Sequence, residues 1–159
     1  MVRLKDLLNA LVREKTEMII VGGLAGIMHG ASYITNDLDI CYRRSKENYQ
    51  SIVKALRPFK PALRGPAGEG IPFLFDEKTL HNGLNFTLKT EAGDIDILGE
   101  LTGIGTYENL LPNVETMPLF GMSLQVISLD DLIRAKKNAG RTKDKIHVDI
   151  LEALKKMNA

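Results

Sequence analysis

Two aspartates separated by one residue give the clearest chemical signal in the sequence. Asp37 and Asp39 lie in the segment Asp-Leu-Asp-Ile at 37–40, whose alternation of acidic and aliphatic residues predicts a half-buried strand. Residues two apart on a strand project from the same face, so these carboxylates are expected side by side. They repel each other unless a cation lies between them, and oxygen-only ligands suit Mg²⁺ or Mn²⁺. The pair therefore predicts a divalent metal site.

A glycine pair lies upstream, at the end of a short apolar segment. Residues 18–21 form a buried-type run that stops at Gly22 and Gly23, and the small residues at 24–30 predict a tightly packed helix. Backbone N–H groups at the start of a helix can hold phosphate oxygens, and glycine permits their close approach. A phosphate cradle thirteen residues before a dicarboxylate metal site indicates nucleoside-triphosphate chemistry.

A third carboxylate is needed to complete a site for two metal ions. The segment Gly-Asp-Ile-Asp-Ile-Leu at 93–98 offers two candidates, Asp94 and Asp96. Asp96 is flanked on both sides by buried-type residues, whereas Asp94 lies at a turn. The sequence therefore predicts Asp96 as the third ligand.

The remaining elements would position these residues. Hydrophobic periodicity predicts a first helix over residues 4–12 and a last helix from about 143, with Ile146, Ile150, Leu151 and Leu154 facing inward. Ser45 and Ser128 are expected to cap two further helices, the second of which ends at Gly140. Strands are predicted at 18–21, 37–42, 85–90, 94–98, 114–119 and 122–127, the last four as two hairpins.

These elements predict an α+β fold. Interleaved helices and antiparallel hairpins indicate a mixed, mostly antiparallel sheet of about four or five strands packed by helices, in a single domain over residues 1–159. Residues 58–72 are rich in proline and glycine, so a binding loop or lid without regular structure is expected there. Arg64, in this loop, is a candidate triphosphate contact.

Composition limits the class of protein. The chain has 159 residues, a net charge of +1 and one cysteine, Cys41, so no global field attracts polyanions and an internal disulfide is excluded. The longest apolar run, residues 18–28, is too short to span a bilayer. A cytoplasmic protein without membrane contact is expected.

The combination of Gly22-Gly23 with Asp37, Asp39 and Asp96 resembles the DNA polymerase β-type nucleotidyltransferase superfamily. Further stretches are similar to its small single-domain members, the minimal nucleotidyltransferase-like proteins related to toxin-type transferases. They are Leu63-Arg64-Gly65, residues 71–73, residues 85–88, residues 94–100, residues 129–136 and residues 139–144. These proteins often carry Arg-x-Thr just before Asp-x-Asp, and here Tyr33 replaces the arginine while Thr35 is kept.

The resemblance implies a nucleotidyltransferase fold and a metal-dependent transferase. Asp37, Asp39 and Asp96 would bind Mg²⁺ or Mn²⁺ and carry catalysis. A nucleoside monophosphate would pass from a nucleoside triphosphate to an acceptor hydroxyl of an RNA, a protein or a small molecule, releasing pyrophosphate. The implied nucleotide contacts are Gly22, Gly23, Thr35, Arg64, Lys136 and Arg141.

Several alternatives stay open at the level of sequence. A dinucleotide-binding fold is disfavoured because Gly-x-Gly-x-x-Gly fails at Leu24 and no parallel βαβ series follows. A catalytically silent nucleotide- or partner-binding module would carry the same residues. A toxin-like transferase acting on tRNA or a partner protein, paired with an antitoxin, is also compatible. The basic run 134–145 could be only a solvated face, and spacing does not separate Lys136 from Lys137.

Overall fold

A seven-stranded sheet forms the centre of the protein in the computed structural model, which describes residues 3–66 and 72–158. The strand order is β3-β4-β5-β2-β1-β9-β8. In chain order the strands are β1 (Met18–Val21), β2 (Asp37–Tyr42), β3 (Ala62–Leu63), β4 (Asn85–Thr90), β5 (Gly93–Leu98), β8 (Glu115–Leu119) and β9 (Met122–Val126). A separate short hairpin pairs β6 (Glu100–Leu101) with β7 (Gly105–Thr106).

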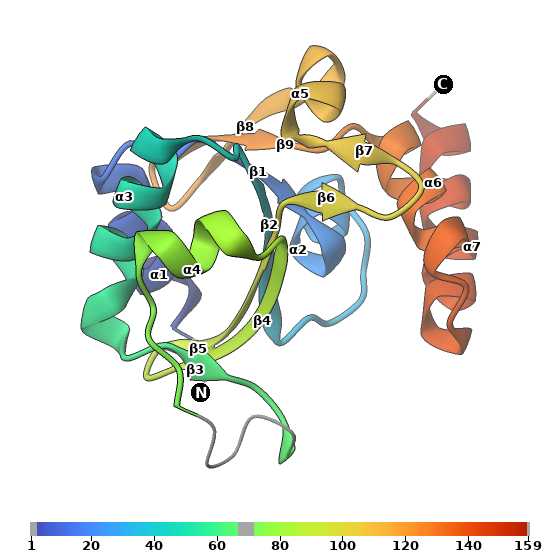
Figure 1. Ribbon diagram of the computed structural model, residues 1–159. Helices are drawn as coiled ribbons and strands as arrows, with labels where there is room; N and C mark the ends of the chain where they lie inside the picture. The colour runs from blue at the N-terminus through green and yellow to red at the C-terminus, as the bar shows by residue number, and fades with distance from the viewer. Residues whose placement is uncertain (1–2, 67–71, 159) are drawn as a thin grey trace.

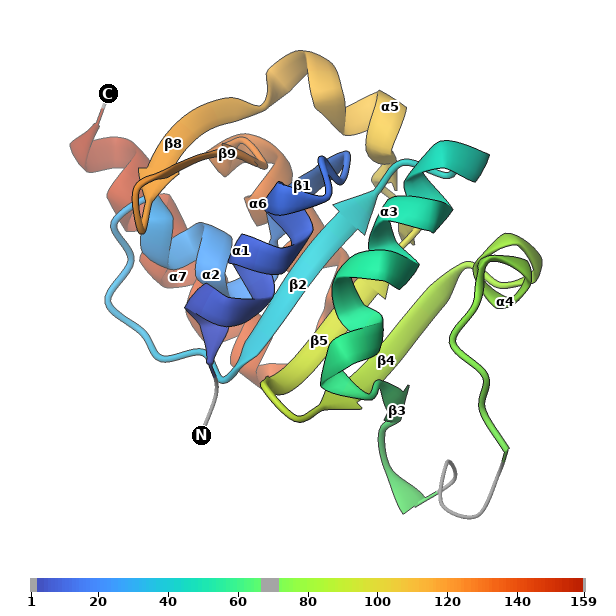
Figure 2. The same cartoon turned by 90° about the vertical axis from the view of Figure 1, so that its left-hand side faces the viewer.

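Helices cover both faces of this sheet. They are α1 (Leu4–Arg13), α2 (Gly22–Met28), α3 (Lys46–Leu56), α4 (Glu77–Asn82), α5 (Tyr107–Leu110), α6 (Leu129–Ala139) and α7 (Thr142–Met157), with 3₁₀ turns at Arg57–Phe59 and Leu111–Asn113. Figure 1 shows α1 and α3 on one side of the sheet and α2, α6 and α7 on the other. In Figure 2 the layer of α1 and α3 faces the viewer. The strands are therefore enclosed between two helical layers.

Local sequence signals explain where the helices begin and end. In α1 the leucines at 7, 8 and 11 are fully buried, as their spacing predicts. The Ser45 side chain accepts a hydrogen bond from the Asn48 N–H, and the Ser128 side chain accepts one from the Asp131 N–H, so both caps are confirmed. Gly140 adopts the left-handed conformation that ends α6.

The sheet has the expected mixed, mostly antiparallel character. In the described residues, four of its six strand pairings are antiparallel, while β2–β5 and β1–β9 are parallel. The α+β fold class is confirmed. The expected number of four or five strands is wrong, because the hairpin β8–β9 joins the main sheet beside β1 and β3 adds a further edge strand.

Three local expectations need correction. The segment 58–72 was expected to lack regular structure, but Ala62 and Leu63 form β3 by pairing with β4; residues 67–71 lie outside the described part. The small-residue helix begins at the glycine pair as expected, but it ends at Met28, two residues before Gly30. Ile146 was expected to face inward, yet it is 57% exposed, because α7 packs through Val148 and Leu151 instead.

Candidate active site

The parallel pairing of β2 with β5 gathers four carboxylates on one face of the sheet. Asp37 is opposite Asp94, and Asp39 is opposite Asp96. Directly paired residues on neighbouring strands project to the same side, and so do residues two apart on one strand. The structure therefore brings the three expected aspartates together. It also brings Asp94 there, which sequence reasoning set aside because of its position at a turn.

The Asp39 carboxyl group has a strongly raised pKa. Burial, followed by the negative charges of Asp96 and Asp37, raises its pKa to about 7, although the positive charge of Lys136 opposes the shift. Its Oδ1 atom is buried and has no hydrogen-bond partner among the described residues. A buried carboxylate oxygen without a donor, beside further carboxylates, fits a divalent cation with oxygen ligands.

Arg64 lies against these carboxylates. Its Nη2 atom donates a hydrogen bond of 2.6 Å to Asp96 Oδ1, and its Nε atom lies 3.3 Å from Asp94 Oδ2. Asp37 Oδ2 is 3.9 Å from Nη1. The guanidinium therefore interacts with three of the four aspartates. No described group of three or more His, Cys, Asp and Glu side chains is arranged to hold a metal ion by itself.

The two glycines allow the first turn of α2 to approach its neighbours closely. Gly22 has φ +66°, and a Cβ at this position would collide with the Asp39 carboxylate. A Cβ at Gly23 would come within 2.6 Å of Thr35 Oγ1. The Thr35 hydroxyl donates to the backbone oxygen of Asp37 at 3.3 Å, at the start of β2. Gly22 thus packs directly against Asp39, and Gly23 packs against Thr35, which is itself bonded to the start of β2.

A partly buried ion-pair network lies where α6 meets α7. Asp144 is fully buried, and its Oδ2 atom accepts a hydrogen bond of 2.6 Å from Arg141 Nε. Lys136 is only 9% exposed, with its Nζ 3.7 Å from Asp144 Oδ1 and 3.1 Å from His147 Nδ1. Burial lowers the pKa of Lys136, although Asp144 and Asp39 act against the shift. Lys137 instead extends to Glu152 and is mostly exposed, so of these two lysines only Lys136 is buried.

Sequence reasoning missed the residues that hold this network together. The Tyr33 ring stacks on His147 with a centroid distance of 4.0 Å and an interplanar angle of 12°. Burial raises the pKa of the Tyr33 hydroxyl to about 12, and among the described residues this hydroxyl has no hydrogen-bond partner. Asp144 was the only acid in a basic run, and this isolation was the available signal of an internal ion pair.

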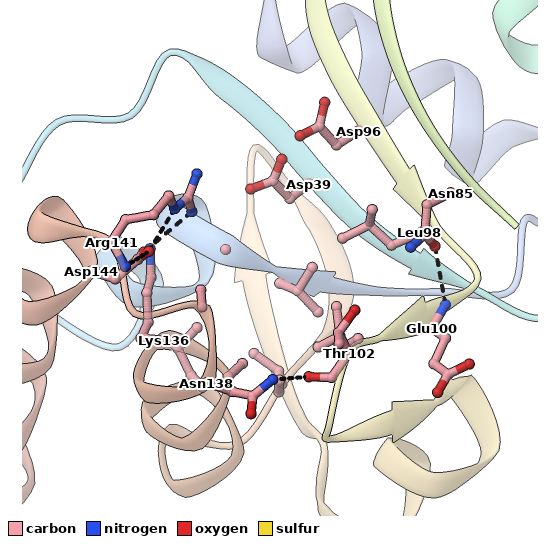
Figure 3. Close-up of a pocket in the computed structure, with 17 residues that line it drawn as sticks. Asp39, Asn85, Asp96, Leu98, Glu100, Thr102, Lys136, Asn138, Arg141 and Asp144 are labelled. Carbon is pink, nitrogen blue, oxygen red and sulfur yellow. Dashed lines mark hydrogen bonds and ion pairs between the residues drawn. The ribbon is translucent and has the colours of Figure 1, made fainter.

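The carboxylates and the charged network face each other across a cleft of about 480 Å³. Figure 3 shows Asp39 and Asp96 on one side and Lys136, Arg141 and Asp144 on the other. The rest of the lining is largely apolar, with polar groups contributed by Asn85, Glu100, Thr102 and Asn138. Of the expected site residues, the cleft is lined by Gly22, Asp39, Asp96, Lys136 and Arg141. Those that do not line it are Gly23, Thr35, Asp37 and Arg64.

No known family model matches the chain, and no curated protein matches it by sequence. Solved structures do match. A Thermotoga maritima protein provisionally described as a nucleotidyltransferase has 20% identity and a TM-score of 0.58, covering 99% of this chain and 94% of its own. The lincomycin-bound lincosamide antibiotic adenylyltransferase LnuA has 16% identity and a TM-score of 0.64, covering 96% and 98%. The antibiotic-resistance factor ANT(2'')-Ia has 11% identity and a TM-score of 0.61, covering 93% and 80%.

At these identities the likeness shows the fold. The chain has the fold of nucleotidyltransferases, as the resemblance in its sequence implies.

Proposed function

We propose that this protein transfers a nucleoside monophosphate from a nucleoside triphosphate to an acceptor hydroxyl and releases pyrophosphate. The observation that carries the proposal is Asp39, whose buried Oδ1 has no hydrogen-bond partner among the described residues, on the wall of a cleft beside Asp96. Its position in a nucleotidyltransferase fold supports the same reaction.

The reaction is proposed to depend on Mg²⁺ or Mn²⁺. Asp37, Asp39 and Asp96 would hold the cation, because hard divalent ions prefer carboxylate oxygens and these three groups otherwise repel one another. When bound, the cation supplies charge neutralisation for the triphosphate and lowers the pKa of the acceptor hydroxyl.

The chain's own residues would orient the substrates and accept a proton. Lys136 and Arg141 line the cleft opposite the aspartates, where they would bind the triphosphate. The acceptor oxygen forms a bond to the α-phosphorus, while the bond between that phosphorus and the bridging oxygen of pyrophosphate breaks. Asp96 would take the hydroxyl proton. Catalysis would come mainly from positioning and charge neutralisation.

A small molecule with a hydroxyl group is the first acceptor to test. The cleft volume of about 480 Å³ is in the range of sites for small molecules. Among the structural neighbours, LnuA binds lincomycin and ANT(2'')-Ia is known in complex with adenylyl-2''-tobramycin. RNA and protein acceptors, and pairing with an antitoxin, remain predictions from the sequence resemblance.

The proposal also includes a single domain over residues 1–159 and a cytoplasmic location. One connected hydrophobic core includes residues from α1 through α7, which supports the single domain. The buried free thiol of Cys41 suits a reducing compartment. In the described part of the chain, no helix is long and apolar enough to cross a bilayer.

The test measures whether the α-phosphate of the donor nucleotide is transferred to an acceptor. The purified protein is incubated with each nucleoside triphosphate labelled at the α-phosphate, with Mg²⁺ or Mn²⁺, and separately with hydroxyl-bearing antibiotics, cellular RNA and cellular protein. The expected result is metal-dependent pyrophosphate release and label on one class of acceptor. The same incubations with Asp37→Asn/Asp39→Asn should give neither. Metal-dependent triphosphate binding without pyrophosphate release under any condition would favour the silent binding module.

A further inference from the structure

Arg64 is fixed at the carboxylate face by backbone and side-chain contacts. Its N–H donates to the Thr87 oxygen at 3.0 Å, directly after β3, which pairs with β4. Its Nη2 atom donates to the Leu88 oxygen at 2.8 Å as well as to Asp96 Oδ1 at 2.6 Å. The side chain is 26% exposed. The backbone of Arg64 is therefore bonded to β4, and its guanidinium extends past β4 to Asp96 on β5.

This contact divides the four aspartates into two sets. Asp37, Asp94 and Asp96 face the guanidinium at distances of 3.9, 3.3 and 2.6 Å. Asp39 has no ion pair with Arg64 and instead faces the cleft beside Gly22. Asp96 belongs to both sets, because it pairs with Arg64 and also lines the cleft.

Two divalent ions in one catalytic site lie about 3.5–4 Å apart and share bridging ligands. A Mg²⁺–oxygen bond is about 2.0–2.1 Å long. An ion bound to Asp96 Oδ1 would therefore compete for the same oxygen with Nη2, which lies 2.6 Å from it. The place beside Asp37, Asp94 and Asp96 is thus held by a guanidinium, a permanent cation that matches carboxylates in shape.

We propose that Arg64 takes the place of the second metal ion, so that the site binds one divalent cation per chain. This cation would be held by Asp39 and by the oxygens of Asp37 and Asp96 that do not face the guanidinium. This inference rests on the proposed function, because it concerns the metal of that same site. Arg64 is then a positioning residue: it holds Asp96 in place and neutralises part of the acidic cluster. The single guanidinium is outnumbered by the four carboxylates, so a divalent ion can still be bound beside it.

The test counts bound Mn²⁺ by equilibrium dialysis and records its electron paramagnetic resonance spectrum. Wild type should bind one Mn²⁺ per chain, with the spectrum of isolated ions. Arg64→Gln should bind two and show the broadened spectrum of a coupled pair. Arg64→Lys keeps a positive charge and should return to one. Arg57→Gln is the matched control: Arg57 bonds to the Phe75 oxygen, not to these carboxylates, so its count should stay at one.

Each other outcome overturns the inference. Two ions in wild type would refute it and leave the proposed transferase intact, since a two-ion site supports the same reaction. One ion in folded Arg64→Gln would show that Arg64 does not exclude the second. If Arg64→Gln fails to fold, which circular dichroism detects, a count of two ions in wild type or in Arg64→Lys still refutes the inference. No Mn²⁺ in any variant would refute both this inference and the metal dependence of the proposed function.

Discussion

The two walls of the cleft bury charge in opposite ways. On the side of β2 and β5, three of the four carboxylates share the Arg64 guanidinium, and the fourth, Asp39, has a buried oxygen without a hydrogen-bond partner among the described residues. On the wall of α6 and α7, one buried carboxylate, Asp144, receives both Arg141 and Lys136. The first wall has an excess of negative charge. On the second wall the buried carboxylate is paired within the chain, and the two cations exceed it by one positive charge.

This difference separates a binding surface from a supporting one. A buried charge is costly unless it is paired, so the unsatisfied wall is the one that gains most from a cation. On the wall of α6 and α7, Asp144 already has its partners before any ligand arrives, and it holds Lys136 and Arg141 in position. Four experiments, in order of expected effect, test this contrast.

The largest effect is expected from removing charge from the unsatisfied wall. Asp37→Asn/Asp39→Asn should weaken Mn²⁺ binding at least about 100-fold, because the site depends on preorganised charge. Calorimetric titration with Mn²⁺ measures this loss. The control Asp6→Asn/Asp149→Asn removes two carboxylates from exposed helical positions. An unchanged Mn²⁺ affinity in the first variant would refute the metal-site assignment.

On the wall of α6 and α7, an aspartate-to-asparagine substitution should lower the stability of the fold. Asp144→Asn leaves Lys136 buried without its carboxylate, and the free energy of unfolding should fall by about 3 kcal/mol. Urea unfolding measures this change. Asp130→Asn is the control: Asp130 pairs with Lys155 at the exposed surface, so its loss should change the free energy of unfolding much less. Equal stability of both variants would mean that the buried network does not support the fold.

A smaller effect is expected at the lysine that faces the aspartates. Lys136→Met keeps the apolar stem and should weaken triphosphate binding by about 1–3 kcal/mol, the scale of a charge-assisted contact. Lys137→Met removes the neighbouring charge, which points to Glu152, and should change little. Binding is measured by calorimetry at low and moderate salt. Equal losses in both variants that vanish together in salt would show only diffuse electrostatics.

The smallest effect is a dependence of stability on pH without metal. The pKa of Asp39 is raised from 3.8 to about 7 in the folded protein, so protonation stabilises the fold. This stability is fully present below about pH 4 and is lost as the pH rises through about 7. The melting temperature of metal-free protein should therefore fall by several degrees between about pH 5 and pH 8. Thermal scans of Asp39→Asn should lack this component of the fall, and an identical fall would contradict the assignment.

Much of the fold follows from short-range patterns. The Ser45 and Ser128 caps, the Gly140 stop and the alternation in β2 depend on neighbours within a few residues, so the sequence alone predicts these boundaries. The sequence also predicts that Asp37 and Asp39 share one face of the sheet, because side chains alternate along a strand. Local alternation is therefore enough to predict the first two acidic residues of the site.

Only the tertiary structure decided how these residues share charge. Arg64 contacts Asp96, which lies 32 residues further along the chain. This contact depends on β3, which directly precedes Arg64 and lies in a segment expected to be a loop. Whether Lys136 or Lys137 enters the cleft depends on how α6 packs against α7, and a stripe of apolar residues alone leaves both positions compatible. The parallel register that adds Asp94 to the cluster depends on strands more than fifty residues apart. Such contacts are set by the packing of the whole core, and local periodicity carries no information about them.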